Sequence, residues 1–418
     1  MEIGLMQLAI RLSLFVVIFL CLDYYVFQSV KVLTADSAYK TSIQWAYWLI
    51  NGTVIALFLV FFLFVSRRTG LNTWVARGLI GLFLLVNVPK LIVLAFLLTE
   101  DVGRIIVLAF QKIVNPTPAT SLPSRRHFVS TAAVLIAAIP FTAIIHGIWR
   151  GRFAFTLRKV DVFFDHLPEA FEGFTVTQLS DIHIGSFDNV EEVERGLGIA
   201  NAAKSDVLLF TGDLVNNMAA EMEPWIGIFS KLHAKEGKYS VFGNHDYGDY
   251  VPWNSAQEKQ QNLNRLKSIH KEIGMDLLCN EHRIIERNGQ KIAIVGVENW
   301  GLPPFPQHGD LDKATAGLGS DVFKILLSHD PSHWDAESCK HPSKPALTLA
   351  GHTHGMQFGI EIPGIKWSPV KFKYPKWADL YESNGQYLYV NRGFGYLAFP
   401  GRVGIWPEIT QFTLRRKK

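Results

Sequence analysis

The chain has 418 residues, which is enough for more than one domain. Apolar residues make up 49% of it and charged residues only 19%, a balance that excludes an ordinary water-soluble enzyme and indicates membrane segments. The net charge of +4 comes from scattered basic residues, so we expect no nucleic-acid partner. The 3 cysteines show no paired spacing, which argues against a disulfide framework and excludes a thiolate zinc site.

Residues 1–150 hold the long apolar runs and are predicted to form a transmembrane region. A run of about 20 apolar residues can cross a bilayer as one helix. The run 75–114 is interrupted at Pro89 and again at Glu100, so it forms either two spans or one span and a short amphipathic helix. We expect two, which gives about five helices in total. The candidate runs are Leu5–Phe27, Ile43–Val65, Val75–Val114 and Phe128–Trp149.

Basic residues beside the spans predict the orientation, because lysine and arginine are enriched on the cytoplasmic side. The pair Arg67-Arg68 and the pair Arg125-Arg126 can both be cytoplasmic only if 75–114 crosses twice. That arrangement places everything after Arg150 outside the cytoplasm. If 75–114 crosses once, the domain turns inward and Arg125-Arg126 breaks the rule. The second pair also resembles a twin-arginine export signal. A plain topology pair before a span is the preferred interpretation, because the pair is internal and other spans precede it.

From about Lys159 the pattern changes to short apolar runs, and five of them end in a polar cluster. Strand, polar loop and helix in repetition predict an α/β layered fold, with helices at Val190–Ala203 and Ala256–Gly274. The five runs are Phe174–Leu179, Val207–Phe210, Tyr239–Phe242, Phe323–Leu327 and Leu347–Ala350.

The polar clusters gather metal-compatible side chains at the strand ends, where α/β sheets bind ligands. Singly, each has an ordinary explanation: Asp181 and Asp213 can cap helices, Asn244 can occupy a turn, and His329 can be a buried core histidine. Jointly these explanations do not account for a potential ligand at every strand end. The set is Asp181, His183, Asp213, Asn244, His245, His329, His352 and His354.

The ordered blocks Asp-x-His, Gly-Asp, Gly-Asn-His-Asp, His and Gly-His-x-His resemble the calcineurin-like metallophosphoesterase family, in its membrane-anchored bacterial branch. The resemblance covers Phe174 to Leu414. It implies a four-layer αββα sandwich for residues 151–418, after the helical transmembrane region, in a multi-pass protein of a bacterial inner or plasma membrane. One departure is Met356, where that branch has a second glycine, and we expect it to change the pocket wall rather than the ligands.

The resemblance also implies two divalent metal ions, with Mn, Fe, Zn and Mg left open. Asp213 would bridge the two ions, and His245 would bind no metal but contact the phosphate. As the catalytic residue, a protonated His245 would either steady the developing charge or protonate the leaving oxygen. The first ion would be held by Asp181, His183 and His354, and the second by Asn244, His329 and His352.

The expected activity is hydrolysis of a phosphomonoester, phosphodiester or diphosphate by a metal-bridging hydroxide, on a membrane or lipid-linked substrate. The alternative is a membrane-anchored metal-binding sensor or transporter subunit without turnover. Arg392 is a further candidate for binding phosphate, or else a plain surface arginine. The aromatic residues Trp367, Tyr374, Trp377 and Tyr381 either line a lipid-facing entrance or pack under a loop. Beyond the bilayer and the substrate, the sequence predicts no protein partner.

Overall fold

The computed structural model describes residues 2–61, 63, 74–114 and 123–417. These residues form two compact units, Met1–His146 and Gly147–Lys418. The arginine pair 67–68 and the Pro/Thr connection 115–120 lie outside the described residues.

The first unit is built from long apolar helices, four of which are long enough to cross a membrane. They are α1 (Glu2–Leu33), α2 (Lys40–Val60), α4 (Trp74–Val114) and α5 (Pro123–Trp149).

The prediction of two spans within 75–114 is wrong, because α4 is one continuous helix of 41 residues with Pro89 inside it. A proline removes one backbone hydrogen bond, but a membrane helix tolerates this loss. Lys90, the residue after Pro89, is buried in the helix and forms an ion pair with Asp23 of α1. Asn87 accepts a further hydrogen bond from Lys90 at 3.0 Å. The region therefore has four long apolar helices among the described residues rather than five.

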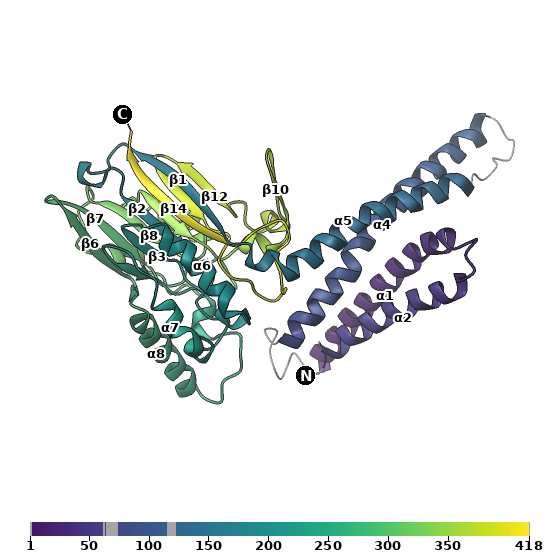
Figure 1. Cartoon of the computed structure of the whole chain (residues 1–418), viewed down its shortest axis with the longest axis horizontal. Helices are drawn as coiled ribbons and strands as arrows, with labels where there is room; N and C mark the ends of the chain where they lie inside the picture. The colour runs from purple at the N-terminus through teal and green to yellow at the C-terminus, as the bar shows by residue number, and fades with distance from the viewer. Residues whose placement is uncertain (1, 62, 64–73, 115–122, 418) are drawn as a thin grey trace. The chain divides into compact units, whose positions relative to one another are not determined.

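The second unit contains two six-stranded mixed sheets and a separate hairpin (Figure 1). The first sheet has the order β1 (Thr156–Phe164), β14 (Glu408–Arg416), β2 (Thr175–Leu179), β3 (Val207–Phe210), β4 (Lys238–Ser240) and β5 (Asp276–Leu277). The second has the order β12 (Asp379–Ser383), β13 (Gln386–Val390), β9 (Leu347–Ala350), β8 (Phe323–Leu327), β7 (Gln290–Gly296) and β6 (Glu281–Arg287). The hairpin pairs β10 (Ile360–Ile362) with β11 (Ile365–Trp367).

The two sheets pack face to face, and helices cover their outer faces. Val176 and Leu209 of the first sheet share one buried cluster with Ile325 and Leu349 of the second. On the other face of the first sheet, Phe210 packs with residues of α6 (Val190–Ala202) and α8 (Ala256–Glu272). The short helix α9 (Leu311–Thr315) packs on the outer face of the second sheet. The predicted four-layer αββα arrangement is confirmed.

Candidate metal centre

The five polar clusters meet at one edge of the sandwich, because the strands before them are neighbours. Strands β2, β3 and β4 are adjacent and parallel in the first sheet, and β8 and β9 are adjacent and parallel in the second. Backbone hydrogen bonds tie the following turns together, from Asp181 N to Gly212 O at 2.9 Å and from Gly351 N to His329 O at 2.9 Å. Gln178 joins the two sheets by donating to the carbonyl of Ala350 at 3.0 Å.

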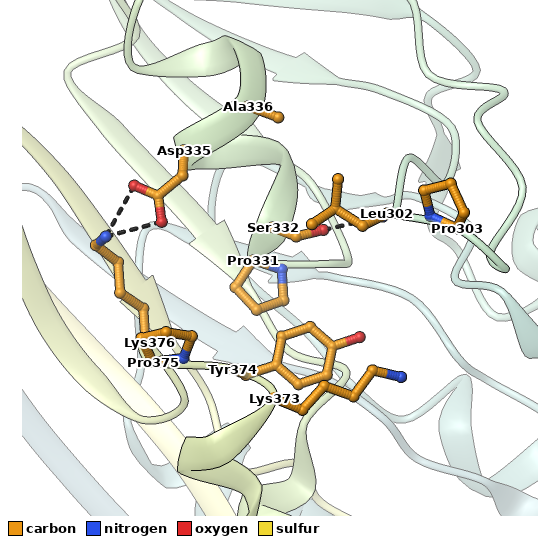
Figure 2. A pocket seen from close by; sticks show the side chains of 10 residues that line it. All are labelled: Leu302, Pro303, Pro331, Ser332, Asp335, Ala336, Lys373, Tyr374, Pro375 and Lys376. Carbon is orange, nitrogen blue, oxygen red and sulfur yellow. Dashed lines mark hydrogen bonds and ion pairs between the residues drawn. The ribbon is translucent and has the colours of Figure 1, made fainter.

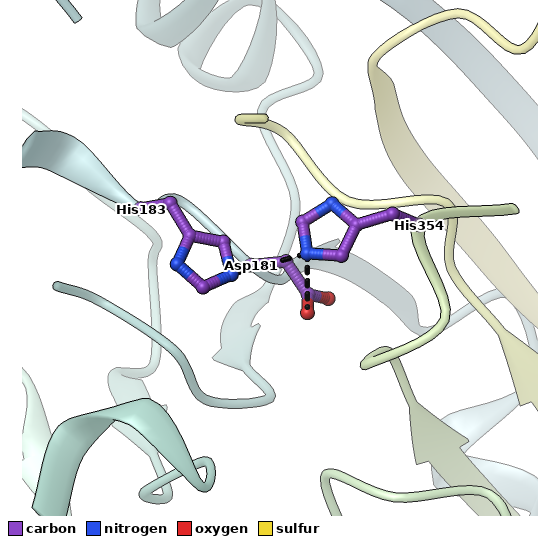
Figure 3. A group of neighbouring side chains, drawn as sticks. All are labelled: Asp181, His183 and His354. Atoms are coloured by element: carbon purple, nitrogen blue, oxygen red, sulfur yellow. Dashed lines mark hydrogen bonds and ion pairs between the residues drawn. The ribbon is translucent and has the colours of Figure 1, made fainter. Parts of the chain in front are cut away.

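Asp181, His183 and His354 form a first group of potential ligands, and all three are buried (Figure 3). The Nε2 atom of His354 lies 3.1 Å from His183 Nε2 and 3.3 Å from Asp181 Oδ1. The imidazole nitrogens and a carboxylate oxygen therefore converge on one small volume.

Asp213, His329 and His352 form a second group beside the first. Asp213 Oδ2 lies 3.1 Å from His329 Nε2 of its own group and 3.4 Å from His183 Nε2 of the first. His352 Nδ1 lies 2.9 Å from Asn244 Oδ1, which brings the predicted amide ligand to this group. These distances place Asp213 between the two groups of potential ligands.

The backbone at the site is held in the sparsely populated left-handed region. The φ angles are 50° at Asp181, 47° at His183, 60° at Asp213, 68° at His352 and 51° at His354. Such conformations cost of order 1–3 kcal/mol each and persist where the surrounding structure enforces them, often at functional sites.

Two glycines make room for these turns. A Cβ on Gly212 (φ 98°) would lie 2.5 Å from the backbone nitrogen of Gly243. A Cβ on Gly351 would collide with the hydroxyl of Ser180 and the carboxylate of Asp181.

Electrostatics set the protonation of the two groups in the absence of an ion. Burial would raise the pKa of Asp181 and of Asp213, but the neighbouring histidines outweigh it and lower both. Burial lowers the pKa of His183 well below its usual value and that of His352 to about 4. These groups are therefore carboxylates and neutral imidazoles at neutral pH, the states that bind metal ions.

His329 is the exception, since the Asp213 carboxylate outweighs its burial and raises its pKa to about 10. Without an ion, His329 is therefore protonated beside the Asp213 carboxylate, with its Nε2 3.1 Å from Asp213 Oδ2. The Nε2 atoms of His183 and His354 converge on the same small volume as the carboxylates of Asp181 and Asp213. A cation bound there would take the place of the proton on His329 Nε2. The residues present therefore suit divalent metal ions.

Contacts outside the two groups orient the ligands, as is usual around metal sites. His329 Nδ1 donates to the carbonyl of Thr211 at 2.8 Å, which turns Nε2 toward the centre. His352 Nε2 lies 2.8 Å from the Tyr374 hydroxyl and 3.5 Å from Asp330. Asn244 donates its amide to Tyr250 at 2.8 Å, so its oxygen stays available.

His245 lies at the centre without belonging to either group. Its backbone N–H donates to Asp213 Oδ1 at 2.8 Å, and its Nδ1 donates to the carbonyl of Asn216 at 2.7 Å. Its ring lies 4.9 Å from that of His183. Burial lowers the pKa of His245, so the free imidazole is neutral, with Nε2 as the nitrogen left for a ligand.

The prediction that Arg392 contacts phosphate is wrong for this structure. Its guanidinium is buried and donates to Glu361, Asp379 and Glu408 at 2.7–3.0 Å. The residue follows a strand of the second sheet, as the site residues do, but its side chain is committed to three carboxylates. The other explanation from the sequence, a plain surface arginine, also fails.

The aromatic cluster is mainly a packing feature. Trp377 is buried with Val370 and Ile405, and the ring of Tyr374 packs against this group. The hydroxyl of Tyr381 accepts from the backbone of Trp377 at 3.2 Å. Of these four aromatic residues, Tyr374 also contacts a candidate ligand, because its hydroxyl lies 2.8 Å from His352 Nε2.

Asp246 is a residue at the site to which the sequence assigned no role. Its carboxylate accepts hydrogen bonds from the backbone N–H groups of Gly243, Asp213, Leu214 and Val215 at 2.8–3.3 Å. Burial and the charge of Asp213 raise its pKa to about 7. The side chain ties the turn after β3 to the turn after β4, and the motif Asn-His-Asp was the only signal for it.

We expect Asp246→Ala to destabilise the second unit by roughly 3 kcal/mol, because several buried N–H groups lose their acceptor. Thermal unfolding of the full chain in detergent measures the change. Asp249→Ala is the control, since it removes an exposed ion pair with Lys259 that contributes little. Equal unfolding temperatures for the two variants would show that the turns hold without Asp246.

Comparison with known proteins identifies the two units. A family model described as "Probable Calcineurin-like phosphoesterase, transmembrane domain" matches residues 6–152, and one described as "Calcineurin-like phosphoesterase" matches residues 174–356. The chain is 31% identical over 254 residues to the metallophosphoesterase YkuE of Bacillus subtilis, a match covering 60% of this chain and 82% of that protein.

Two further relatives fit the same picture. A zebrafish transmembrane protein with a metallophosphoesterase domain is 27% identical over 267 residues, covering 62% of this chain and 56% of that protein. The phosphodiesterase YaeI of Escherichia coli is 24% identical over 296 residues, a match that covers 70% of this chain and 99% of that protein. Fold, ligand groups and these matches define a metallophosphoesterase domain behind a membrane region. The chain belongs to the calcineurin-like metallophosphoesterase family.

Proposed function

We propose that this chain is a membrane-bound hydrolase that cleaves a phosphate ester or diphosphate at a centre of two divalent metal ions. The position of Asp213 between the two ligand groups supports this most directly. Two cations about 4 Å apart need a shared negative ligand between them. When bound, the ions would supply Lewis acidity and a nucleophilic water at neutral pH.

The ligands of each ion follow from the two groups. Asp181, His183 and His354 would hold one ion, and His329, His352 and Asn244 the other. This set of nitrogen and oxygen ligands suits Mn, Fe or Zn. It suits Mg less well, because Mg prefers oxygen ligands to imidazoles. Thr211, Asp330 and Tyr374 keep the histidines oriented.

His245 would act on the leaving group. The free imidazole is neutral, but a phosphate dianion bound beside it favours the imidazolium, because an opposite charge raises the pKa of a histidine. Its Nδ1 is fixed by the carbonyl of Asn216, so a proton added at Nε2 would face the centre. The imidazolium would then donate this proton to the oxygen of the leaving group.

A pocket of about 430 Å³ beside the centre supports a substrate with an apolar part. Figure 2 shows Leu302 and Pro303 on one side, the Lys376–Asp335 ion pair on the other, and Pro331 and Tyr374 between them. Tyr374 links the pocket to the centre through His352. The apolar wall and the lysines suit a phospholipid or a lipid-linked diphosphate.

Filling the pocket should therefore discriminate between substrates. We expect Ala336→Trp to raise the KM for a long-chain lipid phosphate about tenfold and to leave a small soluble ester unchanged, because only the former needs the pocket. Ala202→Trp, on the exposed side of α6, is the control for a bulky surface substitution. An equal effect of Ala336→Trp on both substrates would exclude the pocket as the lipid site.

The side of the membrane is inferred from the basic residues beside the spans. With four spans, the two ends of the helix bundle carry equal numbers of lysine and arginine residues: Lys31, Lys40, Arg104, Lys112, Arg125 and Arg126 at one end, and Arg11, Arg67, Arg68, Arg77, Arg150 and Arg152 at the other. The pair Arg125-Arg126 lies directly before the last span, which leads to the catalytic unit. From this pair we infer that the first end is cytoplasmic and that the catalytic unit lies outside.

In the inferred orientation Arg67-Arg68 lies outside the cytoplasm, whereas the sequence predicts that this pair is cytoplasmic. Reporter fusions after Tyr39 and after Lys418 test it. Cytoplasmic activity at the first and periplasmic activity at the second are expected, and the opposite pattern would place the domain in the cytoplasm.

The hydrolase itself is tested with the full chain stripped of metal and refilled with Mn, Zn, Fe or Mg. We expect turnover of phosphomonoesters or phosphodiesters with at least one metal and none with the stripped protein. No turnover with any metal would favour the sensor or transporter subunit.

A further inference from the structure

The β10–β11 hairpin has one apolar face and one polar face. Because Ile360 pairs with Trp367 and Ile362 with Ile365, these four side chains share a face of the two-stranded ribbon. The other face carries Glu361 paired with Lys366. The hairpin stands apart from the two sheets (Figure 1).

Ion pairs fix the polar face against the body of the unit. Glu361 accepts from Arg158 at 2.7 Å and from Arg392 at 2.8 Å, and Lys366 donates to Asp379 at 2.8 Å. This arrangement explains why the guanidinium of Arg392 is buried and paired with carboxylates. It also forces the apolar face outward, the reverse of an ordinary surface hairpin.

The apolar face is open, and large apolar residues near it in the sequence are exposed as well. Ile360, Ile362 and Ile365 are 50%, 56% and 54% exposed, while Phe372 is 80% and Met356 59% exposed. These side chains fall within one short stretch of the chain. Contiguous exposed apolar residues of this kind mark contacts with a partner or a membrane.

The base of the hairpin adjoins Gly147, the first residue of the second unit. Gly359 donates to the carbonyl of Val403 at 2.9 Å, and Arg402 donates to that of Gly147 at 3.2 Å. Gly147 belongs to the apolar span 125–149. Lys371 and Lys373 flank the face, are exposed, and have no carboxylate partner in the described part of the chain.

We propose that the face formed by Ile360, Ile362, Ile365 and Phe372 docks into the headgroup region of the same bilayer that holds α5. Continuity with the last span argues for lipid rather than for another protein as the occupant. The two lysines would contact anionic headgroups while the isoleucines and Phe372 enter the acyl boundary. Met356, two residues after His354, would then lie at the lipid surface, so the metal centre opens toward phospholipid headgroups.

The test places an environment-sensitive fluorophore on Ile362→Cys in the full chain, with Cys21, Cys279 and Cys339 replaced by serine. The protein is reconstituted into phosphatidylcholine–phosphatidylglycerol vesicles with and without a spin-labelled acyl chain. We expect an apolar emission at this position and quenching by the spin-labelled lipid. Ile284→Cys, 42% exposed on β6, is the control and should show neither.

An unquenched probe at position 362 overturns the proposal, whether the probe is exposed to water or covered by a second copy or another protein. This readout does not depend on hydrolysis, so it fails or succeeds separately from the proposed function. As a second measure, Ile362→Asp combined with Ile365→Asp should lower turnover of vesicle lipid about tenfold relative to a soluble ester. The control Ile284→Asp should change neither the turnover of vesicle lipid nor that of the soluble ester. If the ratio of the two turnover rates is the same in the double variant and in the control, the result counts against docking.

Discussion

Replacing Asp213 with asparagine is expected to abolish hydrolysis, with a loss of roughly 10³-fold or more. The carboxylate lies between the two ligand groups, 3.4 Å from His183 Nε2 and 3.1 Å from His329 Nε2. An amide keeps the shape but removes the charge that two cations would share. We therefore expect loss of metal as well as of turnover.

Metal content by elemental analysis and turnover of a soluble ester measure both effects in the same sample. Asp206→Asn is the matched control, because Asp206 is also a nearly buried strand-end carboxylate but bonds Thr175 and Lys235 outside the centre. It should keep its metal and its activity. Full metal content and activity in Asp213→Asn would contradict the bridging role.

Replacing His245 with asparagine is expected to slow hydrolysis by about 10²- to 10⁴-fold for alkyl phosphates and much less for a p-nitrophenyl ester. An alkoxide is a poor leaving group and needs a proton, whereas p-nitrophenolate departs without one. Metal content should be unchanged, since His245 belongs to neither ligand group.

Rates measured over a series of leaving groups test this role. His282→Asn is the control, because its Nδ1 also donates to a backbone carbonyl, that of Ala314 at 2.8 Å, but on β6 away from the centre. An equal loss for all leaving groups in His245→Asn would assign the residue to phosphate binding rather than to proton transfer.

The candidate ligands could be predicted from the sequence because local order determines their position. Each lies within a few residues after the end of a short strand, and parallel neighbours such as β2 and β3 bring their carboxyl ends to one edge. The division into two groups needed the resemblance, because no spacing along the chain tells whether His352 and His354 face the same ion. The structure separates them.

Contacts between distant segments could not be predicted in this way. Pro89 and Lys90 interrupt the apolar run 75–114 in the sequence, but the structure buries Lys90 in an ion pair with Asp23 of another helix. Arg392 looks available for phosphate until Glu361, Asp379 and Glu408 surround it. Asp246 caps backbone groups that lie more than thirty residues earlier, so its role has no local pattern.

The central claim, a two-metal hydrolytic centre, is tested most directly by titrating the metal-stripped full chain with one active metal ion. Bound metal and turnover of a soluble phosphate ester are followed together. We expect turnover to require both ligand groups and to reach its maximum at two ions per chain. Binding that saturates without any turnover, or full turnover at one ion per chain, would contradict the account.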